Sequence, residues 1–493
     1  MHIYLRRAFE VKEIIIFTAL LLAPLAALYA ADTPEPVKPN IILMLVDDLG
    51  YECLGANGSK TFRDKTPVVD KLAAAGIRFE QAFVQACCTP TRVSLMTGKC
   101  NARNYVHFGL LETAQTTFGH LFRDGGYDTC IVGKWQLGGS VAENTAKHFG
   151  FDEHCLYHIH GTPKDRGKDT SDEYSSRYIN PGLVMNGQTK KFSGNVYAPD
   201  ICNDFVLDYL TRHASPGKAF FLYYPMMLTH APFDPTPDCS DYPGKNGAKR
   251  SDFEHYQDMV AYNDKLIGKI VDKLDQLGLR KNTLLLFTGD NGTPGKFTVE
   301  MNDGTAIHSG KGETAHAGLH VPLVANWPGT IPAGKVCGDL VDVTDFLPTL
   351  CDAAFIKLPQ DFLTDGRSFF PQLRGEKGNP REWIYRWYCP LMNKPQRTVE
   401  MAFTRDFKLY KTGEFYDWRT DGGEEKTLEI AKLTGVATEA AKTLQAAIEQ
   451  FKEARPLDIQ AQADELAGAK QDKRQRRAEN MEKKQTTHLT KPN

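Results

Sequence analysis

The sequence lacks a charge bias of either sign. Its 493 residues contain 59 lysines and arginines against 61 aspartates and glutamates, a formal net charge of −2. A chain that binds nucleic acid or an anionic surface through its overall field needs a marked basic excess. We therefore predict no nucleic-acid partner, and we expect any anionic substrate to meet a local cluster of cations.

The sequence also lacks an apolar run suited to a stable membrane span. The stretch from Ile14 to Leu28 is interrupted by Pro24 and falls short of the roughly 20 residues that a spanning helix needs. Basic residues precede this stretch and small residues follow it near Ala30, which is the layout of a secretory signal. We predict export to the periplasm or the extracellular space after cleavage near Ala30, with retention as a lipid-facing anchor as the alternative.

The sequence has no internal repeat, and its eleven cysteines do not by themselves define a disulfide pattern. Export would permit disulfides. We expect no bridge between Cys87 and Cys88, because linking adjacent residues is strained. Cys87 is interpreted as a small buried side chain.

What the chain does contain is a set of apolar runs, each followed by polar or charged residues. A continuous run of this kind predicts a strand buried on both faces. Helical patterns lie between the runs, one from Thr66 and Pro67 to Gly76 and another from His255 to Leu277. The alternation predicts an α/β fold with a large, mostly parallel central sheet flanked by helices. The runs are Asn40–Val46 before Asp47 and Asp48, Thr129–Val132 before Gly133 and Lys134, Ala219–Tyr224 before Thr229 and His230, and Thr283–Thr288 before Asp290 and Asn291.

The pattern changes after Gly366, where short strands follow one another closely. Arg381–Tyr388, Met401–Thr404 and Phe407–Lys411 predict a smaller C-terminal antiparallel sheet, accompanied by a helix near Ala437–Ala454. From Lys470 the chain is basic and free of aromatic residues, which predicts disorder. The predicted segments are a signal peptide at 1–30, a catalytic domain at 36–365, a small C-terminal subdomain at 366–456 and a basic, disordered tail at 457–493.

The polar residues after the strands predict one site assembled from distant segments. Open α/β sheets bind ligands beyond the carboxyl ends of their strands. Asp47 and Asp48, together with Asp290 and Asn291, offer hard oxygen ligands that suit Ca²⁺, with Mg²⁺ as the alternative, and that do not suit zinc. Each pair taken alone is also typical of caps and turns. The metal site is therefore a hypothesis that requires the two pairs to meet.

Cys88 lies in the run Cys87-Cys88-Thr89-Pro90-Thr91-Arg92, with proline two positions after it and arginine four positions after it. Taken alone, it is equally a buried thiol or half of a disulfide. The run resembles the maturation signature of type I, formylglycine-dependent sulfatases, and continues as Met96-Thr97-Gly98-Lys99 with two conservative departures. The resemblance implies the alkaline-phosphatase-like sandwich of that superfamily and a formylglycine made from Cys88. It also implies a partner that makes this group, either a formylglycine-generating enzyme or an anaerobic sulfatase-maturing enzyme.

The resemblance further implies a role for each site residue. In the family, one oxygen of the hydrated aldehyde attacks sulfur, and the other loses its proton so that sulfate leaves. Arg92 would hold the formylglycine hydroxyl, and His230 would protonate the leaving oxygen. The implied catalytic residues are Cys88, Arg92, Lys134, His230 and Lys311, the substrate-binding residues are Lys134, Gln136, His230 and Lys311, and the metal ligands are Asp47, Asp48, Cys88, Asp290 and Asn291.

Gln136 departs from the family, which has a histidine at this position of the motif Gly133–Gly138. Glutamine can hydrogen-bond but cannot take a proton. We therefore expect another base, His316 or a water, to assist sulfate release, or release to be slow. Several histidines either contact the substrate or simply pack, and the sequence does not rank them: His107, His158, His160, His316 and His320.

Together these motifs predict a sulfuric ester hydrolase that acts on a sulfated carbohydrate or an aryl ester, and carbohydrate is favoured by analogy alone. The nearest alternative is a phosphodiesterase or phosphonate hydrolase on the same scaffold, because tetrahedral anions of similar size suit the same cations. A second alternative, motivated by Gln136, is a sulfated-glycan-binding protein with impaired turnover.

Overall fold

The computed structural model describes residues 37–138, 145–158, 177–214, 217–243, 251–390 and 398–468. Residues 39–493 form one compact unit and residues 1–38 another. The predicted signal peptide lies outside the described residues. Within the described part of the chain, no helix is long and apolar enough to cross a membrane.

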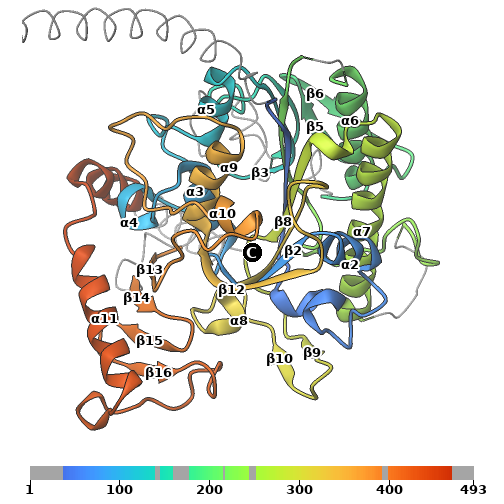
Figure 1. Cartoon of the computed structure of the whole chain (residues 1–493). Helices are drawn as coiled ribbons and strands as arrows, with labels where there is room; N and C mark the ends of the chain where they lie inside the picture. Colours follow the sequence, from blue (N-terminus) through green and yellow to red (C-terminus); the bar gives the residue numbers. More distant parts are fainter. Residues whose placement is uncertain are drawn as a thin grey trace, which may run out of the picture. The chain divides into compact units, whose positions relative to one another are not determined.

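A sheet of ten strands runs through the larger unit (Figure 1). In chain order its strands are β1 (Asn40–Val46), β2 (Ile77–Phe83), β3 (Asp128–Trp135), β4 (Glu153–His158), β5 (Gly182–Met185), β6 (Gln188–Lys191), β7 (Phe220–Pro225), β8 (Thr283–Gly289), β11 (His320–Asn326) and β12 (Lys335–Asp342). All four predicted strands are present, and β1 has the predicted bounds.

The strand order across the sheet is β12-β2-β11-β8-β1-β7-β3-β4-β5-β6. The central strands β8, β1, β7, β3 and β4 are all paired in parallel. β11 runs antiparallel to both of its neighbours, and β5 and β6 add an antiparallel edge. The sheet is therefore mixed, with the predicted parallel arrangement at its centre.

The middle strand explains the uninterrupted apolar run in the sequence. Ile41 and Leu43 of β1 pack into the core on one face of the sheet, whereas Ile42 and Met44 pack into the core on the other. Every residue of β1 is buried. A strand covered on both faces needs apolar side chains at successive positions, not at alternate ones.

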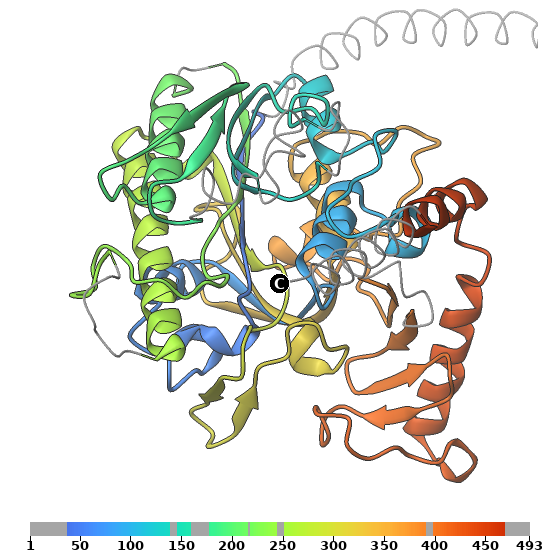
Figure 2. The same ribbon diagram turned by 180° about the vertical axis from the view of Figure 1, so that it is seen from behind.

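Helices cover both faces of the sheet (Figures 1 and 2). One layer includes α2 (Pro67–Ala74), α6 (Ala198–Arg212) and α7 (Asp252–Gln276), and the other includes α3 (Cys88–Thr97), α5 (Phe118–Asp124) and α9 (Phe346–Ala353). α2 and α7 confirm the two predicted helices, and Ser251 and Glu254 form a capping box at the start of α7. The shorter helices are α4 (Asn101–Asn104), α8 (His316–Leu319) and α10 (Phe370–Leu373), and 3₁₀ turns lie at Tyr51–Cys53, Gly55–Asn57, Arg280–Asn282, Val343–Asp345 and Ile430–Lys432.

A second, smaller sheet lies toward the C-terminus, as predicted. It is antiparallel throughout and consists of β13 (Ile384–Tyr388), β14 (Val399–Phe403), β15 (Phe407–Tyr410) and β16 (Phe415–Asp417), with α11 (Val436–Gln450) packed against it. Apolar residues of this sheet share a core cluster with Phe83 of β2 and Leu319 of α8. A separate two-stranded ribbon is formed by β9 (Thr298–Glu300) and β10 (Ala306–His308). The domain boundary between residues 365 and 366 stays a prediction.

The predicted tail begins later than expected. Residues 457–468 are helical, and Ile459 and Ala463 are buried in the core. The spacing of these two side chains, four residues apart, places them on the same face of a helix. The basic composition that suggested disorder begins only at Lys470, and residues 469–493 lie outside the described part of the chain.

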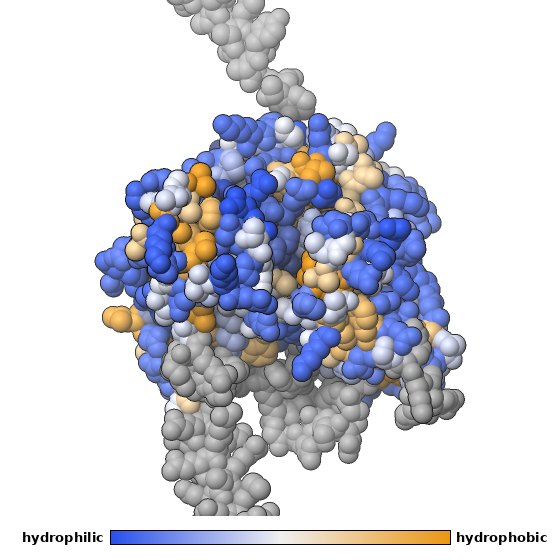
Figure 3. Space-filling view, turned by 90° about the horizontal axis from the view of Figure 1, so that it is seen from below, coloured by the Kyte–Doolittle hydropathy of each residue, from blue (hydrophilic) through white to orange (hydrophobic). Residues whose placement is uncertain are grey.

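All eleven cysteines are free thiols. Cys88 is buried, whereas Cys87 is partly exposed, so the interpretation of Cys87 as a buried side chain is wrong. Seen from below, the surface is mostly hydrophilic, and hydrophobic residues gather in separate patches (Figure 3). Large exposed apolar side chains such as Val336, Phe355 and Leu363 occur singly along the chain, which is ordinary for a protein surface.

Candidate active site

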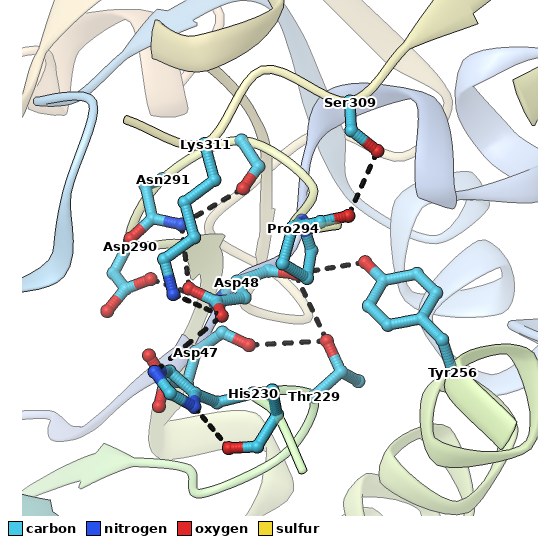
Figure 4. Close-up of polar contacts among 12 residues, drawn as sticks. Asp47, Asp48, Thr229, His230, Tyr256, Asp290, Asn291, Pro294, Ser309 and Lys311 are labelled. Carbon is cyan, nitrogen blue, oxygen red and sulfur yellow. Dashed lines mark hydrogen bonds and ion pairs between the residues drawn. The ribbon is translucent and has the colours of Figure 1, made fainter. Parts of the chain in front are cut away.

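The ends of parallel strands bring the predicted site residues together. Asp47 and Asp48 directly follow β1, and Asp290 and Asn291 directly follow β8, whose last residue pairs with Val46. His230 lies beyond β7, on the other side of β1. Figure 4 shows these side chains converging on one point. The two pairs lie together, as the metal-site hypothesis requires, and the metal site itself stays a prediction.

The oxygen ligands are buried and linked to one another. The backbone N–H of Asp48 donates to Asp290 Oδ1 at 2.9 Å, and Asn291 Nδ2 donates to Asp48 Oδ1 at 2.8 Å. Asn291 Oδ1 is buried and has no hydrogen-bond partner. Ligand atoms of Asp47, Cys88 and Asp290 lie within 4.8 Å of one another, as do those of Asp47, Asp48 and His230. An unpartnered amide oxygen beside buried carboxylates fits a hard divalent cation.

The backbone at Asp48 is held in an unusual conformation. Asp48 has a φ of 65°, a left-handed value that is uncommon for residues other than glycine. Its carbonyl oxygen accepts hydrogen bonds from the hydroxyl groups of Thr229 at 3.1 Å and Tyr256 at 2.9 Å (Figure 4). These contacts orient the Asp48 carboxylate toward Lys311 and Asn291.

Each cation that the sequence singled out is paired with a carboxylate. Arg92 donates to Asp290 Oδ2 through Nε at 3.0 Å and Nη2 at 2.7 Å, while its Nη1 is buried without a partner. Lys134 Nζ lies 2.7 Å from Asp47 Oδ1, and Lys311 Nζ lies 2.5 Å from Asp48 Oδ2. Lys134 is part of β3 and does not follow it, because the strand continues to Trp135.

Burial and neighbouring charges shift the pKa values of Asp47 and Asp290 in opposite directions. Burial would raise the pKa of Asp47, but Lys134, His230, Arg92 and Arg177 together hold it well below the usual value. Burial and the negative charge of Asp47 raise the pKa of Asp290 to about 8, although Arg92 and Lys134 oppose this shift. Before any divalent cation binds, the buried carboxylates thus compete with one another for the same positive charges.

Cys88 begins α3 and is 2% exposed. A hydrogen bond from the neighbouring Cys87 thiol, together with the positive charges of Lys134 and Lys311, lowers the pKa of the Cys88 thiol well below its usual value, although burial acts in the opposite direction. The positive end of the helix dipole also lies at this residue. The site is therefore arranged to hold negative charge at position 88.

His230 and Gln136 complete the predicted set. His230 Nδ1 lies 2.5 Å from the carbonyl oxygen of Ala231, and Nε2 lies 3.9 Å from Asp48 Oδ2. Burial lowers the pKa of His230, and the carboxylates of Asp47 and Asp48 only partly offset that effect. Gln136 is buried two residues beyond Lys134, and its Oε1 has no hydrogen-bond partner.

Two of the remaining candidate histidines, His316 and His320, are packing residues. The ring of His316 lies against Phe83, His320 and Trp418, and burial lowers its pKa to about 4. His320 stacks on Tyr51 with ring centres 4.0 Å apart. His316 and His320 therefore pack against aromatic rings, as one of the two alternatives for these histidines stated. His316 is poorly placed to act as the base that assists sulfate release. His107 Nδ1 lies 2.6 Å from the carbonyl oxygen of Phe108, and the side chain of His158 and the whole of His160 lie outside the described residues.

Arg177 is a further cation of this site that the sequence motifs do not mark. Its Nη1 donates to Asp47 Oδ2 at 3.0 Å, and its guanidinium carbon lies 5.6 Å from the ring centre of Tyr157. The side chain is 7% exposed. Arg177 follows no apolar run and belongs to no recognised motif, so the sequence contains no signal that would have marked it.

Two family models match the chain. The first, described as Sulfatase, matches residues 39–356, and the second, described as N-sulphoglucosamine sulphohydrolase, C-terminal, matches residues 314–488. Human arylsulfatase A is 31% identical over 423 residues, covering 79% of this chain and 77% of the relative. Mouse N-acetylgalactosamine-6-sulfatase is 29% identical over 392 residues, covering 74% and 72%.

Solved structures share the fold. Ps i-CgsB in complex with k-i-k-neocarrahexaose superposes with a TM-score of 0.69 at 24% identity, covering 87% of this chain and 98% of that one. A protein in complex with its substrate D-glucosamine-2-N,6-O-disulfate gives 0.63 at 21% identity, with coverage of 85% and 98%. The phosphonate monoester hydrolase of Agrobacterium radiobacter gives 0.59 at 22% identity, with coverage of 86% and 96%. At these identities the likeness concerns the fold alone.

Proposed function

Because the chain belongs to the sulfatase family of the alkaline-phosphatase-like superfamily and is a sulfuric ester hydrolase, we propose that it removes sulfate from a carbohydrate through an oxidised form of Cys88. The observation that carries this proposal is the placement of Cys88 at a helix start among buried carboxylates and cations. The choice of a carbohydrate is supported by the sugar ligands of two structural neighbours.

A formylglycine hydrate at position 88 would supply two oxygens, one to attack sulfur and one whose loss of a proton lets sulfate leave. An unmodified thiol has a single nucleophilic atom and is a soft partner for a hard cation. Arg92 supports this assignment, because its buried Nη1 lacks a partner and can donate to an oxygen on residue 88. The modification requires a maturation enzyme, which we propose as a transient partner.

We assign Asp47, Asp48, Asp290 and Asn291 as ligands of a divalent cation, Ca²⁺ with Mg²⁺ as the alternative. The bound ion would supply positive charge next to residue 88. The all-oxygen donor set and the unpartnered Oδ1 of Asn291 support the assignment. The ammonium groups of Lys134 and Lys311 contact the metal-binding carboxylates of Asp47 and Asp48. Once the metal ion helps to neutralise these carboxylates, both lysines can bind sulfate oxygens.

His230 donates a proton to the leaving oxygen. With Nδ1 hydrogen-bonded to the Ala231 carbonyl, the proton for transfer is on Nε2, the nitrogen that lies nearer Asp48. Burial and the charges of Lys134 and Arg177 lower the pKa of His230, which favours release of that proton. An alcohol is a poor leaving group without a proton, so His230 assists cleavage of the S–O bond.

Two measurements test the proposal. Mass spectrometry of the peptide that contains Cys88 should detect an aldehyde in the active enzyme, and an active enzyme with an intact thiol would contradict the mechanism. Hydrolysis of paired aryl sulfate and aryl phosphate substrates should favour the sulfate. A clear preference for phosphate would support the phosphonate hydrolase alternative, which the fold likeness alone does not distinguish.

A second candidate function, binding of sulfated glycans with impaired turnover, is favoured by Gln136. Its buried Oε1 accepts hydrogen bonds but takes no proton at neutral pH. Single-turnover kinetics of the wild type and Gln136→His compare attack with release. If release limits turnover, Gln136→His should accelerate the steady state and leave the first turnover unchanged. Tight binding without sulfate release in either form would support the binding-protein candidate.

We also propose that the chain is exported. The basic, apolar and small-residue segments before Ala30 support this proposal. N-terminal sequencing of the mature protein should begin close to Ala31, and a retained N-terminus on a membrane-associated protein would support the anchor alternative.

A further inference from the structure

Arg177 is a buried cation to which neither the proposed metal site nor the proposed transfer of sulfate assigns a direct contact with the substrate. It contacts Asp47 Oδ2, on the opposite oxygen from Lys134. Its guanidinium also lies within 6.0 Å of the ring centres of Tyr157 and Tyr178. Aromatic faces attract a guanidinium and restrict its orientation. Arg177 is therefore held in place at the site and is not a mobile surface residue.

The described part of the site contains more positive groups than carboxylates. Asp47 alone is surrounded by three cations, with Lys134 at 2.7 Å, Arg177 at 3.0 Å and Arg92 at 3.6 Å. The full set is four cations (Arg92, Lys134, Arg177 and Lys311) against three carboxylates (Asp47, Asp48 and Asp290). The negative charge that the site is arranged to hold at Cys88 offsets this excess, and a bound divalent cation would restore it. Unbalanced charge is costly to bury, so the metal-loaded site calls for an anionic ligand.

Neutralising Asp47 does not by itself explain Arg177. Lys134 already forms a close ion pair with Asp47, and its side chain is 0% exposed. Adding Arg177 as a further buried cation at the same carboxylate costs desolvation energy that a single negative charge repays only in part. The extra charge is explained if a second anion occupies the site during function.

We propose, building on the assignment of sulfate ester hydrolysis, that Arg177 is a substrate-binding residue that holds the sulfate group together with Lys134. Asp47 lies next to both Cys88 and His230, the groups assigned to attack and to protonation. Arg177 is hydrogen-bonded to that carboxylate, so it lies close to the point where sulfur would be attacked. Its planar fork has five N–H donors, and among the described residues Asp47 accepts from one of its nitrogens, so other donors can face sulfate oxygens.

The proposed role of Arg177 also bears on Gln136, which stands where the family has a histidine. A histidine at that position would place a charge beside the sulfate only while protonated, whereas a guanidinium remains charged at every physiological pH. Arg177 supplies this charge from a different segment, just before β5. The proton transfer that a histidine would perform is not replaced by Arg177, because a guanidinium does not act as a base in this pH range.

The test is binding of inorganic sulfate to the Ca²⁺-loaded, full-length enzyme, measured by isothermal titration calorimetry. Arg177→Gln should weaken sulfate binding by roughly tenfold to a hundredfold, the range for one hydrogen bond to a charged group. Arg177→Lys should retain part of the affinity because it keeps the charge. Arg212→Gln is the matched control, since Arg212 also lies over a tyrosine ring and pairs with an acidic residue, but it is exposed and belongs to α6.

Ca²⁺ titration of the same variants separates the two roles of Arg177. As a substrate-binding residue, Arg177→Gln loses sulfate affinity and keeps or improves Ca²⁺ affinity, because a cation that competes for Asp47 is removed. Sulfate affinity within twofold of the wild type, with tighter Ca²⁺ binding, would overturn the proposal and leave Arg177 as a counterion of Asp47. If Arg177→Gln does not fold, wild-type sulfate affinity in Arg177→Lys would overturn it, because an ammonium cannot reproduce the fork.

Failure of the proposed function has a different outcome. In that case the wild type would hydrolyse no aryl sulfate, whatever the behaviour of the Arg177 variants. A wild type that hydrolyses aryl sulfate, combined with an Arg177→Gln variant that binds sulfate normally, would contradict only the role of Arg177.

Discussion

Two of the buried charge clusters in the described part of the chain differ in how completely their polar groups are paired. The strand-edge cluster consists of Asp47, Asp48, Asp290, Asn291, Arg92, Lys134, Arg177 and Lys311. The Lys408 cluster consists of Lys408, Thr314, Tyr410, Trp418 and Glu424. Lys408 has a side chain that is 0% exposed, and its Nζ donates to the Thr314 carbonyl at 2.5 Å, the Tyr410 hydroxyl at 2.7 Å and the Glu424 carboxylate.

The Lys408 cluster is closed, whereas the strand-edge cluster is open. An ammonium has three donors, and all three donors of Lys408 have partners, with one carboxylate for one cation. In the strand-edge cluster, cations outnumber carboxylates, and Asn291 Oδ1 and Arg92 Nη1 have no partner. The ammonium group of Lys408 has no donor free to bind a ligand. Its hydrogen bonds instead join β15 to the segment after Lys311. An open cluster is incomplete until a metal ion and an anion bind.

The largest expected effect is the loss of activity in Cys88→Ala. Hydrolysis of an aryl sulfate should fall to the uncatalysed level, because alanine provides neither a thiol nor its oxidised form. The midpoint of thermal unfolding should change little, since the substitution removes one small atom. Cys351→Ala is the matched control, because Cys351 is equally buried, packs in the core of α9 and lies in neither cluster. Retained hydrolysis in Cys88→Ala would contradict the mechanism.

The next largest effect is expected for Asp290→Ala. Removing a ligand should weaken Ca²⁺ binding by at least about a hundredfold and abolish turnover, since a carboxylate ligand is lost and Arg92 loses the carboxylate to which it donates two hydrogen bonds. Calorimetric titration with Ca²⁺ measures the effect. Glu424→Gln in the closed cluster is the control and should bind Ca²⁺ as the wild type does. If chelation of the wild type followed by dialysis leaves its rate unchanged, the metal assignment is wrong.

Lys408→Met should show the opposite pattern, a loss of stability without a loss of metal affinity. Breaking a buried ion pair from one side leaves Glu424 uncompensated and costs about 3–5 kcal/mol. Denaturant unfolding measures this cost, and Ca²⁺ titration at a permissive temperature should match the wild type within twofold. A free energy of unfolding within about 1 kcal/mol of the wild type would show that the closed cluster is not important for stability.

The smallest effect concerns pH and His316, whose ring packs against Trp418 of the Lys408 cluster. Burial lowers the pKa of His316 from 6.5 to about 4. Between these values the unfolded chain binds a proton that the folded chain excludes, so stability is complete above pH 6.5 and falls as the pH drops toward 4. The loss should be about 1–3 kcal/mol, reduced from the full value because the ring is partly exposed.

His316→Phe isolates this contribution, because phenylalanine keeps the contacts with Phe83 and Trp418 but does not titrate. Thermal unfolding midpoints measured from pH 7 to pH 4.5 should fall less steeply for His316→Phe than for the wild type. Parallel curves would mean that acid destabilisation arises elsewhere, for example at the carboxylates of the strand-edge cluster.

Sequence patterns predicted the strands and motifs well because these depend on local chemistry. The apolar run of β1 and the acidic pair that follows it are adjacent in the chain, so both were visible. The start of the tail was misplaced, because the burial of Ile459 and Ala463 depends on a core to which distant segments contribute. The predicted strand ended at Val132, before Lys134, for a similar reason. Pairing with β4, a distant segment, extends β3 through Trp135.

The sequence by itself determined the fold class, the parallel centre of the sheet, the acidic pairs and the run around Cys88, since each is written in neighbouring residues. Only the tertiary structure decided which cation meets which carboxylate. Arg92 pairs with a residue 198 positions away and Arg177 with one 130 positions away. Such pairings depend on distances between side chains from different strands, and no local pattern encodes them. The open strand-edge cluster therefore emerges only when the sheet is assembled.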